Sequence, residues 1–160
     1  MALQLVEGAV DTLFAYLEAN LATHVAAVNA LHGVTAGDAT YISMPNLYVA
    51  EQAVMPPLPA AMVVGEASSP YVDGPNHLKS VHSLLVLVVD EGQFQNDLKR
   101  KGYRYGEAVV KAIRAGRSTT LQVAGLGAPY AVFQPIYTNS ADKYRQDVHV
   151  RVQLTTWEND

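Results

Sequence analysis

Residue types that commonly do chemistry in proteins are few in this sequence. No H-E-x-x-H string occurs, and no histidine pair at helical spacing comes with a metal-site glutamate. We place His82 and His149 on strands where they could be neighbours, but two histidines without a placed carboxylate make a poor zinc site. Because the chain has no cysteine, disulfides, thiolate metal sites and cysteine nucleophiles are excluded together. We therefore expect no bound metal.

Motifs of phosphate binding and nucleophilic catalysis are missing as well. Gly125-Leu-Gly127 precedes Ala-Pro-Tyr and not a helix, so it indicates a turn and not a phosphate-binding loop. The sequence contains no Gly-x-Ser-x-Gly elbow and no glycine loop followed by a P-loop lysine. A catalytic pair assembled from distant carboxylates stays open as an alternative. The sequence favours a protein that is not an enzyme and has no cofactor.

Charged residues give the stronger signal, because they are unevenly distributed. Residues 1–78 hold seven acids and no lysine or arginine, whereas all eleven lysines and arginines lie in residues 79–160. Seven of these cations lie close together, with Glu107 as the only acid among them: Lys99, Arg100, Lys101, Arg104, Lys111, Arg114 and Arg117. Such clustering suits phosphate binding, an acidic protein partner or a solvated helix face. The overall asymmetry is either an incidental dipole or the mark of an acidic surface that meets a basic surface of the next copy.

Contact surfaces are also indicated by the composition. Only 16% of the residues are charged against 49% apolar, and nine tyrosines stand against three phenylalanines. Tyrosines near strand ends suit either a contact surface or half-exposed core packing. The residues that we predict to form interfaces are Arg100, Lys101, Arg104, Lys111, Arg114, Asp11, Glu18, Tyr71 and Asp73.

Two amphipathic helices must position these charges. Apolar residues at intervals of three and four, from Val6 to Leu31, predict a helix over residues 3–31 that Gly33 ends. A second helix is predicted over Gln93 to Ala115, with Arg100, Arg104, Glu107, Lys111 and Arg114 on the side opposite its apolar stripe. Gly102 is expected to weaken or kink this helix, at a cost of about 1 kcal/mol relative to alanine.

The remaining segments predict strands joined by loops. We expect a central strand over 78–90 that is apolar on both sides and therefore covered on both, and a closing strand in which Val148, Val150, Val152 and Leu154 alternate with polar residues. Further strands are expected at 40–43, 47–49, 61–66, 120–123 and 130–137. Residues 33–76 are loop-rich, with a stiff proline-rich connector at 55–59 and a projecting loop at 68–75, and 138–143 forms a hairpin loop. The fold class predicted is a single α+β domain over residues 1–160, with an antiparallel or mixed sheet packed by both helices.

The order of these elements resembles that of the tail terminator or tail-completion (neck) proteins of tailed bacteriophages and related particles. The resemblance lies in the long N-terminal helix, the strand HSLLVLVVDEG, the helix in KGYRYGEAVVKAI and the closing strand YRQDVHVRVQLTTWE, and it covers about residues 3–157. It implies a virion protein that forms a homo-oligomeric ring, commonly a hexamer, and that caps the tail tube and joins it to the head-tail connector or stopper.

On this interpretation the partners are further copies of the chain, the tail tube protein and the connector, and DNA could pass through the lumen. The protein would be made in the host cytoplasm without contact with a membrane, since no apolar run reaches the roughly 18 residues that span a bilayer. The loops 68–75 and 138–143 would dock on neighbours. Other functions stay open: another head-completion adaptor, a nucleic-acid-binding domain that uses the basic helix, or a small enzyme whose site is assembled from loops.

Overall fold

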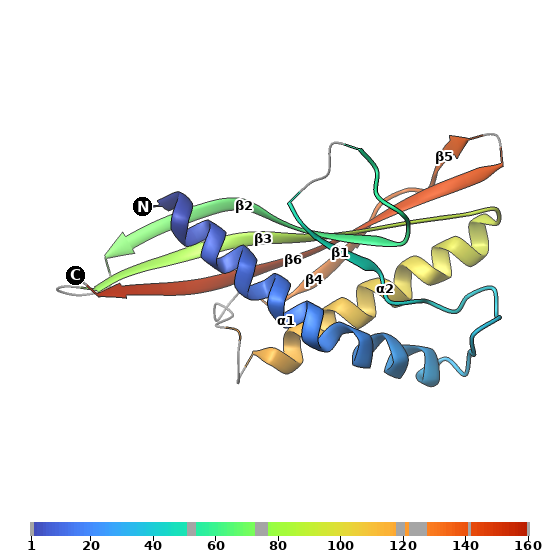
Figure 1. Ribbon diagram of the computed structural model, residues 1–160, viewed down its shortest axis with the longest axis horizontal. Coiled ribbons are helices and arrows are strands. Elements are labelled where there is room, and N and C mark those ends of the chain that lie inside the picture. Colours follow the sequence, from blue (N-terminus) through green and yellow to red (C-terminus); the bar gives the residue numbers. More distant parts are fainter. Residues whose placement is uncertain are drawn as a thin grey trace.

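The computed structural model shows two helices packed on one side of a six-stranded sheet (Figure 1). It describes residues 2–50, 54–72, 77–117, 121, 128–140 and 142–159. The helices are α1 (Ala2–Leu31) and α2 (Gln95–Gly116). The strands are β1 (Asn46–Val49), β2 (Ala60–Val72), β3 (His77–Gly92), β4 (Tyr130–Phe133), β5 (Tyr137–Ser140) and β6 (Lys143–Asn159).

The sheet is mixed, which confirms the predicted α+β class. Its strand order is β1-β2-β3-β6-β4, and β5 pairs with another part of β6. β1 runs parallel to β2, whereas all other neighbours are antiparallel. The long strands β2, β3 and β6 lie side by side, so β3 is central as its sequence predicted.

Alternation along β3 and β6 decides which side chains enter the core. Leu84, Val86 and Val88 of β3 pair in register with Val152, Val150 and Val148 of β6, and all six are buried under the helices. On the opposite side of β3, Leu85 and Val89 are buried and Leu87 is half-buried. The predicted alternation of the closing strand is therefore confirmed, and the helices cover one side of the sheet.

The N-terminal helix α1 confirms the helix predicted over residues 3–31 from the spacing of its apolar residues. Its stripe of Val10, Leu13, Leu17, Leu21, Val25 and Val28 lies in the core. The helix ends at Leu31, and Gly33 follows with a φ of 65°, a left-handed conformation that glycine adopts without strain. No described helix is both long enough and apolar enough to span a membrane.

The segment after α1 differs from the prediction, because residues 40–43 form no strand. Instead, the side chain of Asn29 replaces a neighbouring strand: its Nδ2 donates to the Ile42 carbonyl at 2.8 Å, and its Oδ1 accepts from the Ile42 N–H at 3.0 Å. Asn29 and Ile42 are both buried. One side chain thus satisfies the backbone groups that a strand would have paired.

Gly102, the glycine that was expected to weaken α2, lies where this helix packs closely against the sheet. The helix is continuous through Gly102, and a Cβ atom there would lie 2.7 Å from Cδ of Gln146, whose side chain is 2% exposed. At Gly106 a Cβ would lie 2.8 Å from the Phe133 ring. The missing side chain at Gly102 thus makes room for the sheet, and the helix is not interrupted there.

Three predicted loops and strands need correction. Residues 68–72 belong to β2 and pair with β3, because the complementary strand stabilises a sequence that looked loop-like from its serines and proline. The strand predicted over 130–137 is interrupted at residues 134–136, where Pro135 lacks the N–H that a ladder needs. Residues 137–140 are strand β5 and not a loop. The strand predicted at 120–123 and the turn at 125–127 lie outside the described residues, apart from Leu121, which is buried and not in a strand.

A buried histidine joins the three long strands. His82 of β3 is fully buried, its Nδ1 hydrogen-bonds the Ser68 hydroxyl of β2 at 2.9 Å, and its Nε2 hydrogen-bonds the Thr156 hydroxyl of β6 at 2.8 Å. It does not neighbour His149, because it pairs in register with Leu154. Burial lowers the pKa of His82 by disfavouring its charged form.

This arrangement predicts a pH dependence of stability. Because the pKa of His82 is lower in the folded chain than in the unfolded chain, the unfolded chain binds the proton first as the pH falls. Stability is therefore complete above the unfolded value of about 6.5 and is lost as the pH falls from there toward the folded value. Urea unfolding between about pH 7 and pH 5 should show a decline that His82→Asn reduces. An identical decline in the variant would contradict this role of His82.

Candidate assembly interface

The outer side of α1 carries acids and small residues. Glu7, Asp11 and Glu18, hereafter the acidic face, are exposed and fall within about 40° of one another on a helix of 3.6 residues per turn. Within the described part of the chain, none of the three forms an ion pair. Beside them the exposed positions are mainly alanine, at Ala15, Ala19, Ala22 and Ala26. A solvated helix side usually carries mixed charges, so this surface is unusually smooth and of one sign.

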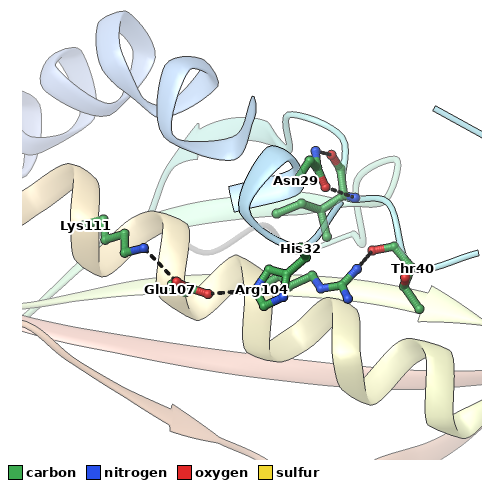
Figure 2. A network of polar contacts seen from close by, with 7 residues as sticks. Asn29, His32, Thr40, Arg104, Glu107 and Lys111 are labelled. Carbon is green, nitrogen blue, oxygen red and sulfur yellow. Dashed lines mark hydrogen bonds and ion pairs between the residues drawn. The ribbon is translucent and has the colours of Figure 1, made fainter. Parts of the chain in front are cut away.

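On the outer side of α2, Glu107 is in contact with two basic side chains. Lys111 Nζ donates to Glu107 Oε1 at 2.7 Å, and His32 Nε2, from the residue just after α1, lies 3.2 Å from Glu107 Oε2 (Figure 2). The hydrogen bond from Lys111, followed by that from His32, lowers the pKa of Glu107. Lys111 is therefore balanced within the chain and contributes little net charge to the surface.

Arg104 is a structural residue, although its sequence position suggested a surface role. Its side chain is directed at the segment after α1, and Nη1 donates to the Thr40 carbonyl at 2.6 Å (Figure 2). The residue is only 9% exposed. It ties α2 to the same segment that Asn29 holds from α1, so it is not available to a partner.

The other cations of α2 divide into paired and unpaired groups. Lys101 forms an ion pair with the buried Asp90 at 2.8 Å. Lys99 donates to the Gln134 carbonyl and lies 5.5 Å from the ring centre of Tyr103. Arg100 and Arg114 of α2 and Arg117, the residue after it, are exposed, and their side chains have no partner in the described chain; these three are hereafter the cationic face.

A groove lies next to Arg100. It has a volume of about 220 Å³ and is lined by His32, Arg100, Tyr103, Arg104 and Glu107. Tyr103 is 49% exposed and stands edge-on to Phe133, with ring centres 4.9 Å apart. His32 and Tyr103 were not predicted as site residues. The helical positions placed Tyr103 beside Arg100, but nothing in the sequence indicated that the end of α1 would lie over α2.

The remaining predicted interface residues lie elsewhere. Tyr71 is in β2 and belongs to neither helix, and its backbone pairs in register with Lys79 of β3. Asp73 lies outside the described residues. Cations of β6 are paired within the chain, with Lys143 on Glu91 at 3.1 Å and Arg151 on Glu66 at 3.2 Å. The described residues contain no group of three side chains that could hold a metal ion.

Comparisons with known proteins were made by sequence and by structure. No family model and no curated protein matches the chain. Among solved structures, a chain from a structure described as "Virion of native gene transfer agent (GTA) particle" aligns with 18% sequence identity over 88% of this chain and 95% of that chain, with a TM-score of 0.27. A similarity this weak identifies neither a fold nor a function.

Proposed function

We propose that this chain is a structural virion protein of a tailed phage or related particle, and that its copies form a ring, six in number by the family resemblance, at the junction of head and tail. The observation that supports this best is the presence of two unlike, unpaired charged surfaces on one chain. The acidic face lies on α1 and the cationic face lies on α2 and the residue after it, and the described chain pairs neither internally.

Unlike surfaces favour head-to-tail assembly. A two-fold dimer uses the same patch on both subunits, whereas a heterologous interface joins two different patches and closes into a ring if its rotation allows. An acidic patch repels itself and attracts a cationic one, so charge alone favours the heterologous arrangement. The role of such a ring is geometric: one rim ends the tail tube and the other holds the connector.

Nucleic-acid binding by the basic helix has less support than a protein interface. Of the seven clustered cations, Lys101 and Lys111 are ion-paired and Arg104 is buried. Phosphate binding depends on several free cations at one surface, and these contacts remove three of them. Of the four that remain, Lys99 donates to the Gln134 carbonyl, which leaves the three arginines of the cationic face.

Locating the protein in the particle tests this function. Particles that carry a peptide tag at the C-terminus of the chain, marked with a gold-labelled antibody, should show label at the junction of head and tail in electron micrographs. Particles made without this gene should have tails that are unattached or of uncontrolled length. Label elsewhere, or normal particles in the absence of the protein, would contradict the proposal.

A further inference from the structure

We infer that Glu18 of one copy binds in the groove beside Arg100 of the next copy, an inference that rests on the ring proposed above. The groove is lined by two cationic residues, a histidine and a carboxylate, and most of these groups already have partners. Both oxygens of Glu107 are engaged by Lys111 and His32, and Arg104 donates to Thr40. Arg100 is thus the lining cation for which the described chain provides neither a hydrogen-bond partner nor an ion-pair partner.

The free guanidinium determines what the groove accepts. Arginine presents its donors in a planar fork that matches a carboxylate. Tyr103 adds a half-exposed aromatic ring to the same groove, and tyrosine and arginine are enriched at protein interfaces. The groove therefore suits an acidic side chain that projects from a smooth protein surface.

Glu18 fits this description better than the other exposed acids of the chain. It lies near the middle of α1, and the exposed positions around it are Ala15, Ala19 and Ala22. Because the distance between packed helices depends on the side chains at the contact, alanines let a second helix approach closely. Glu18 does not pair with Arg100 of its own chain, so a contact between these two residues requires a second copy.

The spacing along the two helices gives the interface a direction. From Glu18 back to Glu7 is about 16 Å along α1, and from Arg100 forward to Arg114 is about 21 Å along α2 at 1.5 Å per residue. With Glu18 on Arg100, Arg114 comes within side-chain reach of Glu7 only if the helices run antiparallel. The acidic face then lies along the cationic face of the neighbouring copy.

A charge exchange tests this pairing. Glu18→Arg and Arg100→Glu should each weaken self-association by at least about tenfold in sedimentation velocity, because each places like charges together. Both changes in one chain should restore association to within about threefold of the original, since the pair reforms with its signs exchanged. Mixing the two single variants should also restore assembly, because alternating copies then meet through favourable pairs.

Controls separate this inference from the proposed function. Gln153→Arg adds a positive charge at an exposed position of β6, on the side of the sheet away from both helices, and should leave association unchanged. Circular dichroism should show all variants folded, as the altered side chains are exposed. If the original chain assembles and the single variants assemble equally well, or the exchanged chain does not recover, the Glu18–Arg100 pairing is wrong while the ring stands. If the original chain never assembles, the ring itself is wrong.

Discussion

Gly102→Ala is expected to destabilise the protein, and Gly8→Ala, the same change in the other helix, is expected to stabilise it. Alanine favours a helix over glycine by about 1 kcal/mol at both positions. At Gly102, however, the added methyl group would overlap the amide group of Gln146, which has little room to move aside because it is buried between α2 and β6, and overpacking costs about 1–3 kcal/mol. At Gly8 nothing lies within 4 Å of the new atom. The two substitutions should therefore change the stability in opposite directions, because only Gly102 lies close to the sheet.

Thermal unfolding measures both effects. Each kcal/mol corresponds to about 2–4 °C in a protein of this size. The melting temperature should fall for Gly102→Ala and rise by up to about 4 °C for Gly8→Ala. A rise for both variants would show that α2 does not approach β6 as closely as described.

Arg104→Met is expected to lower the free energy of unfolding by about 1.5–3 kcal/mol, because a hydrogen bond from a charged group to the Thr40 carbonyl is lost in a buried place. Methionine keeps most of the aliphatic packing of the arginine stem, so the loss reports chiefly on the guanidinium. The segment that Asn29 and Arg104 hold together should loosen, while α2 stays helical.

Arg100→Met, one turn earlier on the same helix, is the matched control. Its side chain is exposed and unpaired in the described chain, so the change should stay within about 0.5 kcal/mol. Urea denaturation below the concentration at which the protein associates compares the two variants without an interface contribution. Equal losses in the free energy of unfolding would contradict the assignment of Arg104 as a structural residue and Arg100 as a surface residue.

Local patterns in the sequence were sufficient to predict the long helix α1 and the long strand β6. The intervals of three and four residues gave α1, and the alternation of Val148, Val150, Val152 and Leu154 gave the buried side of β6. These patterns are reliable because all the apolar residues of one element must face the same core. In a helix this requires intervals of three and four residues, and in a strand it requires alternation.

Features that depend on distant partners could not be predicted. Thr40, which accepts from Arg104, is 64 residues away in the sequence, and on a helical wheel Arg104 is indistinguishable from the exposed Arg100. Ser68 to Val72 looked like a loop by composition, yet pairing with β3 makes it a strand. The separation of acidic and basic residues was visible in the sequence, while the paired and buried members of the basic cluster were distinguishable only in the folded chain, and the interface itself stays a prediction.

Sedimentation velocity of the purified protein at two salt concentrations tests head-to-tail assembly most directly. At about 0.1 M salt, where charges interact over about 10 Å, we expect one closed species whose mass is an integer multiple of the monomer mass. At about 1 M salt, where screening shortens this range to about 3 Å, the species should dissociate. A protein that stays monomeric at every concentration, or an assembly that salt does not weaken, would contradict it.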